Sequence, residues 1–124
     1  MPIIKSSESP IFEIPGLTVT GFASPSRGAR ETSTWRLVIA PGAPGATHSV
    51  DREEIFVVLD GTAHATLGDQ RLDLTAGDTL IVPANTPFSL SNQGTEPCTA
   101  IAMLPVGGRA ALPEGAPFVP PWAA

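Results

Sequence analysis

The spacing of prolines and glycines constrains the fold of this chain more than any other feature. Fourteen prolines and twelve glycines divide the 124 residues into short runs of apolar or alternating residues. Runs of this kind are typical of β-strands, whereas a helix needs a longer uninterrupted 3.6-residue period. We expect strands at residues 17–22, 34–40, 54–60, 62–67, 70–74, 79–82, 88–91 and 98–104. Their regular spacing predicts an all-β protein, a small antiparallel sandwich or barrel.

The length predicts one domain, and the C-terminal end is unlike the rest. A chain of 124 residues can bury one core, and no repeat or linker divides it, so we expect a single domain over residues 1–124. Five prolines in residues 105–124 exclude a helix or a central strand there. The same segment carries Phe118, Val119 and Trp122, and free tails seldom hold such large apolar groups. It is therefore predicted to be an extended segment packed on the barrel or on a partner subunit.

Charge and composition exclude several classes of partner. The net charge is −5 and the seven Lys and Arg residues are scattered, so no basic surface is expected to bind nucleic acid. No apolar run approaches the roughly 20 residues of a membrane-spanning helix, and we expect no membrane partner. The start of the chain has no secretion signal, which favours a cytoplasmic location. Cys98 is the only cysteine, which excludes an internal disulfide and a cysteine-based zinc site.

Two stretches, residues 42–61 and 77–92, resemble the two motifs of the cupins. These motifs have the forms G-x5-H-x-H-x3-E-x6-G and G-x5-P-x-G-x2-H-x3-N. Seven of their positions match here: Gly42, His48, Glu54, Gly61, Gly77, Pro83 and Asn92. The resemblance implies a jelly-roll fold, or double-stranded β-helix, in which three histidines and the glutamate bind one metal ion inside a small barrel.

The sequence departs from the cupin motifs at the metal-binding positions. Val50 replaces the second histidine and Phe88 the third, while Asn85 replaces the inner glycine of the second motif. A catalytic divalent ion usually needs at least three protein ligands. We therefore expect no metal cofactor, and a metal, if bound at all, would have only His48 and Glu54 as ligands.

The Asp60-Gly61 pair predicts which side chains face inward. Asp-Gly favours a two-residue hairpin turn, which would set Val57 opposite His64. In that hairpin Glu54 shares the inner face with Phe56 and Val58, and His64 lies outside, where it cannot replace the missing ligand. The predicted pocket consists of an apolar wall around His48 and Glu54, made by Val50, Phe56, Val58, Phe88 and Leu90.

His48 and Glu54 are the candidate catalytic residues. An apolar wall raises the pKa of a carboxyl group, so the two side chains could serve as an acid–base pair. Such a pair could move a proton on a small, largely apolar carbonyl compound, as in a metal-independent isomerase, epimerase or cyclase. Two alternatives stay open: a metal-dependent oxygenase or hydrolase with a reduced ligand set, and a non-catalytic module that binds or senses a small molecule. The two groups could also form only a buried ion pair.

The resemblance also implies a homodimer, because small cupins commonly pair. The outer face that carries Ile55, Val57 and Leu59 is apolar and needs a cover. A second copy would provide one. The N-terminal strand or the segment around Trp122 are alternative covers.

Overall fold

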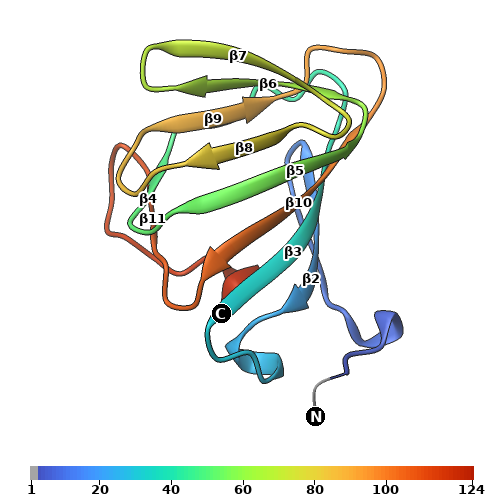
Figure 1. The fold of residues 1–124 in the computed structure, drawn as a ribbon, viewed down its shortest axis with the longest axis vertical. Coiled ribbons are helices and arrows are strands. Elements are labelled where there is room, and N and C mark those ends of the chain that lie inside the picture. The colour runs from blue at the N-terminus through green and yellow to red at the C-terminus, as the bar shows by residue number, and fades with distance from the viewer. Residues whose placement is uncertain (1–2) are drawn as a thin grey trace.

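The fold consists of two antiparallel sheets that face each other, with the C-terminal segment beside them (Figure 1). This computed structural model describes residues 3–124. One sheet has six strands in the order β1-β2-β3-β10-β5-β8, one has three in the order β7-β6-β9, and β11 pairs with β4. The strands are β1 (Ile11–Ile14), β2 (Leu17–Ala23), β3 (Thr32–Ile39), β4 (Ser49–Val50), β5 (Glu54–Asp60), β6 (Thr62–Leu67), β7 (Gln70–Thr75), β8 (Thr79–Val82), β9 (Phe88–Ser91), β10 (Cys98–Pro105) and β11 (Ala110–Ala111). The all-β prediction is confirmed.

The helical elements of residues 3–124 are three single 3-10 turns. They are η1 (Ser6–Glu8), η2 (Pro25–Arg27) and η3 (Pro121–Ala123). In this part of the chain no helix has the length and apolarity needed to span a membrane.

All eight predicted strands are present, with ends within two residues of those expected, but three short strands were not predicted. β1 forms a hairpin with β2 around Gly16, whose φ of +78° suits glycine. Its side chains are mostly exposed, so its sequence lacks the alternation of apolar and polar residues that indicates a half-buried strand. β4 and β11 are two residues each, which is too short for any period to show.

The predicted hairpin between β5 and β6 is wrong. β5 pairs with β10 and β8, whereas β6 pairs with β7 and β9 in the other sheet. Gly61, with a φ of +81°, turns the chain from one sheet to the other, and a Cβ there would collide with the carbonyl oxygen of Pro97. The inward and outward faces are nevertheless as predicted, because side chains alternate within each strand whatever its partner. Glu54 and Phe56 are buried, and His64 is half-buried beside Asp73 on the outer side.

Residues 105–124 return along the barrel and close one side of it. β11 pairs with β4, and η3 lies against β2 and β3. The hydroxyl of Ser33 donates a hydrogen bond to the carbonyl oxygen of Ala123 at 3.0 Å. The ring of Trp122 lies 6.1 Å from that of Phe12 and 6.4 Å from that of Trp35, centroid to centroid. The segment that was predicted to be extended thus packs on the barrel, and it contains the short strand β11 and the 3-10 turn η3.

Candidate functional site

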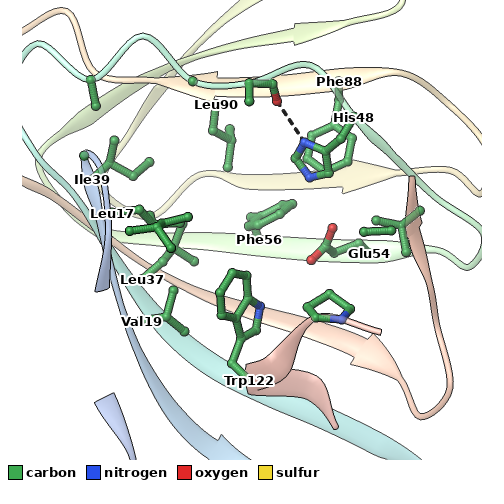
Figure 2. A pocket seen from close by; sticks show the side chains of 18 of the residues that line it. Leu17, Val19, Leu37, Ile39, His48, Glu54, Phe56, Phe88, Leu90 and Trp122 are labelled. Atoms are coloured by element: carbon green, nitrogen blue, oxygen red, sulfur yellow. Dashed lines mark hydrogen bonds between the residues drawn. The ribbon is translucent and has the colours of Figure 1, made fainter. Parts of the chain in front are cut away.

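A cavity of about 330 Å³ lies between the two sheets (Figure 2). Apolar side chains from β2, β3, β5, β9 and the C-terminal segment form most of its wall. Ligand pockets in proteins commonly have volumes of roughly 300–1,000 Å³ and a few polar groups in a largely apolar lining. The size and character of the cavity therefore suit a small organic molecule.

Glu54 places a carboxyl group in this wall. As the first residue of β5 it points inward by strand alternation, and it is only 5% exposed. Its Oε1 atom is buried without a hydrogen-bond partner among the described residues. Burial raises the pKa of Glu54 to about 8. At neutral pH the group is mostly protonated, so it can donate a hydrogen bond or a proton to a molecule in the cavity.

His48 lies immediately before β4 and is held by backbone and ring contacts. Its backbone N–H donates to Phe88 O at 3.0 Å, and the Phe88 N–H donates to His48 O at 2.8 Å. The ring Nδ1 lies 2.8 Å from the carbonyl oxygen of Ala46, which can only accept, so Nδ1 carries a proton. The ring also packs on Phe88 at a centroid distance of 4.3 Å. In the neutral ring Nε2 is then the acceptor, available as a base.

His48 and Glu54 both reach into the cavity, yet they do not pair with each other. Figure 2 shows the two side chains on opposite walls of the same end of the cavity. The ion pairs found within residues 3–124 join His64 to Asp73 and Arg109 to Asp51. The structure therefore does not show a buried ion pair between His48 and Glu54, and a molecule bound between them could connect the two groups.

Four of the five predicted pocket residues line the cavity: Val50, Phe56, Phe88 and Leu90. For Val58 the prediction is wrong, because this residue is buried in the core and is not part of the cavity wall. It lies further along β5, toward the turn at Gly61 where the chain crosses between the sheets.

Two parts of the cavity wall were not predicted. Trp35, Leu37 and Ile39 line the cavity from β3, and the alternation of that strand could have indicated them. Trp122 lines it from η3. No local pattern marks Trp122, since its place depends on the return of the C-terminal segment along the barrel.

The metal ion implied by the cupin motifs does not fit these residues. Phe88 is 0% exposed and its ring occupies the side of His48 where the third histidine would stand. Val50, also buried, offers no lone pair. Within residues 3–124 no three side chains of His, Cys, Asp or Glu gather as metal ligands. One imidazole and one carboxyl group fall short of the usual three ligands.

Comparison with known proteins identifies the class of this protein. The cupin domain family matches residues 35–104, more than half of the chain, so the protein belongs to the cupins. Solved structures share the jelly-roll fold, which confirms the predicted architecture. The polyketide cyclase RemF from Streptomyces resistomycificus superposes with a TM-score of 0.80 at 14% identity, over 94% of this chain and 87% of RemF. An RmlC-like cupin from Shewanella frigidimarina gives 0.72 at 19% identity, over 85% of this chain and 90% of that one.

Curated relatives match only a segment of the chain. Mannose-1-phosphate guanylyltransferase 2 from Escherichia coli O157:H7 is 40% identical over 50 residues, which is 40% of this chain and 10% of the enzyme. The uncharacterized protein MJ1618 from Methanocaldococcus jannaschii is 36% identical over 45 residues, or 36% of each chain. The chain thus spans about a tenth and about a third of these two relatives.

Proposed function

We propose that this cupin binds a small, largely apolar carbonyl compound and moves a proton on it without a metal ion, as an isomerase, epimerase or cyclase does. The observation that carries the proposal is the Glu54 carboxyl group, which lines the apolar cavity and whose buried Oε1 atom has no hydrogen-bond partner within residues 3–124. A buried polar atom without a partner costs free energy, and such atoms in native proteins call for an explanation. A ligand that accepts a hydrogen bond from Glu54 would remove this cost.

The two candidate residues would act on different atoms of one substrate. Protonated Glu54 donates to the carbonyl oxygen, and the Nε2 atom of His48 removes a proton from the adjacent carbon. The C–H electron pair becomes the C=C bond of an enol, and the carbonyl oxygen takes the proton of Glu54. When His48 returns a proton to carbon and the enol O–H proton goes back to Glu54, the product is an isomer or epimer. Alternatively, the enol carbon attacks a second carbonyl group and closes a ring: the enol oxygen returns its proton to Glu54, and the oxygen of the second carbonyl takes the proton of His48. The separation of His48 from Glu54 supports this division of roles.

Deuterium uptake from D2O tests the proposal. The substrate is 2-acetylnaphthalene, whose methyl protons exchange through the enol, and NMR follows their loss. We expect the protein to accelerate exchange, and Glu54→Gln or His48→Gln to lower the rate by about 10²- to 10⁴-fold, the usual contribution of a general acid or base. His64→Gln is the matched control, since His64 lies on the outer face and should leave the rate unchanged.

Two results would refute proton transfer by these residues. One is an exchange rate that Glu54→Gln leaves intact. The other is a bound ketone whose exchange the protein does not accelerate, which would support a non-catalytic binding module. Loss of exchange after treatment with a chelator would instead support the metal-dependent alternative.

We also propose that the outer face of β5, β8 and β10 binds a second copy of the chain. Leu59 and Ile81 are 50% and 54% exposed there, and Ile55 lies between Ile81 and Met103 across the strands. β1 lies at the opposite edge of this sheet and Trp122 faces the cavity, so neither of the alternative covers reaches this face. The uncharged residues of such a face do not repel their own copies in a two-fold contact.

Light scattering would test this contact. We expect a dimer that Ile81→Lys dissociates, and a protein that stays monomeric at high concentration would refute it.

A further inference from the structure

We infer that the ligand of the cavity is an uncharged, flat, ring-bearing ketone or enol, held with its oxygen toward Glu54 and His48. The inference rests on the proposed function, because it concerns the same cavity. It adds the charge, the shape and the orientation of the ligand.

The charge of the ligand follows from the ionisable groups of the wall. His48 and Glu54 are the titratable side chains that the described residues contribute to it, and no Lys or Arg is among the lining. Arg109 pairs with Asp51 at 3.2 Å outside the cavity. A carboxylate or phosphate that leaves water needs a cationic partner. Only a protonated His48 would provide one, and it could not then act as a base.

The shape of the ligand follows from the aromatic side chains. Phe56, Phe88 and His48 form a continuous series of rings, with centroid distances of 5.8 Å and 4.3 Å between neighbours. Trp122, whose ring centroid is 6.4 Å from that of Trp35, lies across the cavity from Phe88 and His48 (Figure 2). Aromatic faces attract flat π-systems through offset-stacked and edge-to-face contacts. A flat ring system between Trp122 on one side and His48 and Phe56 on the other would contact both sides. The fully buried Phe88 supports the His48 and Phe56 rings.

The orientation follows from the uneven distribution of polar atoms. Glu54 and His48 lie at one end of the cavity, whereas Leu17, Leu37 and Ile39 gather at the other (Figure 2). An oxygen atom at the aliphatic end would lose its hydrogen bonds to water without replacement. The oxygen of the ligand therefore belongs at the Glu54 end and the hydrocarbon rings at the other.

Calorimetric titration of the full chain with four related compounds tests charge, polarity and shape separately. They are 2-acetylnaphthalene, 2-naphthoate, 2-ethylnaphthalene and 2-acetyldecalin. At pH 7 we expect the ketone to bind about tenfold or more tightly than the carboxylate, which has no cation to pair with. The ethyl compound, which lacks the oxygen, should bind about threefold to tenfold more weakly. The decalin, which is not flat, should lose about as much.

Two variants test the orientation and the aromatic contact. Glu54→Leu should make the acetyl and ethyl compounds bind alike, because it removes the group that recognises the oxygen. Trp122→Ala should weaken the ketone about tenfold, and Trp122→Phe should restore part of this loss. Phe22→Leu changes an aromatic residue outside the cavity, under Arg36, and should leave binding unchanged. Circular dichroism of each variant confirms that it is folded.

The inference is overturned if 2-naphthoate binds as tightly as the ketone, or if acetyldecalin does. A preference for the acetyl over the ethyl compound that persists in Glu54→Leu overturns the orientation, and failure of all four compounds to bind overturns the whole inference. Binding is measured without turnover, so its outcome is separate from that of deuterium exchange. The expected binding order without exchange would refute the proposed catalysis and leave the ligand class standing.

Discussion

Two buried polar side chains, Asn92 and Glu54, occupy positions of the two cupin motifs, yet their surroundings differ completely. Asn92 is 1% exposed and Glu54 is 5% exposed. The Nδ2 of Asn92 donates to the carbonyl oxygens of Ile39 at 3.0 Å and Glu96 at 2.7 Å, and its Oδ1 accepts from the Gly94 N–H at 2.9 Å. The Oε1 of Glu54 has no partner among the described residues.

This difference separates a structural role from a functional one. A buried amide with all its partners joins the ends of strands and stabilises the fold. A buried carboxyl group with an unpaired oxygen costs free energy, and the proposed ligand would account for its presence. At the cupin motif positions this chain has Asn92 with its partners and Glu54 without two of the histidines, because Val50 and Phe88 stand in their places.

The largest expected effect is a pH dependence of stability that belongs to Glu54. The folded chain keeps the proton of Glu54 up to a pKa of about 8, whereas the unfolded chain releases it near 4.5. Between these values the folded state binds more protons, so its stability falls as pH rises, by about 1.4 kcal/mol per pH unit. The total loss is about 5 kcal/mol and is complete about one pH unit above the folded-state pKa, and most of it falls between pH 5 and 8. Urea unfolding from pH 5 to 8 measures it.

The matched variant for this effect is Glu54→Gln, which does not titrate. Subtracting its stability curve from that of the unmodified protein cancels the contribution of every other group. Parallel curves would show that Glu54 titrates normally, and the contrast with Asn92 would then be lost.

A smaller but still large loss of stability is expected from Asn92→Ala. The substitution leaves the Gly94 N–H and the carbonyl oxygens of Ile39 and Glu96 without their partner. Each unsatisfied buried group costs about 1–3 kcal/mol, and partial access of water reduces the sum to about 3 kcal/mol. Chemical unfolding measures this loss, and Gln93→Ala, an exposed neighbour, is the control. A loss no greater than that of the control would contradict the structural role of Asn92.

How far the sequence predicts this molecule depends on whether a feature is local. Alternation within a strand is local, so it correctly placed Glu54 and Phe56 inside and His64 outside. The pairing of strands is not local. Asp60-Gly61 has the chemistry of a hairpin turn, yet the chain crosses there between sheets because β5 pairs with β10.

The limits of the cavity were unpredictable for the same reason. Val58 has the same parity as Phe56, and only the packing of the two sheets decides that the cavity ends before it. Trp122 reaches the cavity through a C-terminal segment whose course depends on β4, Ser33 and Trp35. The presence of a pocket beside His48 and Glu54 could thus be inferred from motif residues, but the far wall required the complete fold.

The substitution Glu54→Leu is expected to increase the stability of the folded chain rather than to reduce it. Glu54→Leu replaces the unpartnered carboxyl group with an apolar side chain of similar size, and it removes the cost of burying a polar atom. We expect the free energy of unfolding at pH 4, where Glu54 is mostly protonated in both states, to rise by about 1–2 kcal/mol, while proton exchange on the ketone at pH 7 is lost. Thermal and urea unfolding beside the exchange assay would show this trade of stability against activity. Destabilisation in a folded Glu54→Leu variant would mean that the carboxyl group has a structural partner.

The smallest expected change in stability comes from His48→Gln. Such a small change would support a functional role for His48, like that proposed for Glu54, rather than a structural role like that of Asn92. The hydrogen bond from Nδ1 to the Ala46 carbonyl is exposed, so water can replace it, and the backbone bonds to Phe88 do not depend on the side chain. We expect the free energy of unfolding to change by about 0.5 kcal/mol or less. Proton exchange should nevertheless fall as far as in Glu54→Gln, because the base is gone. A loss of stability as large as that of Asn92→Ala would show instead that the ring of His48, packed on Phe88, supports the barrel as Asn92 does.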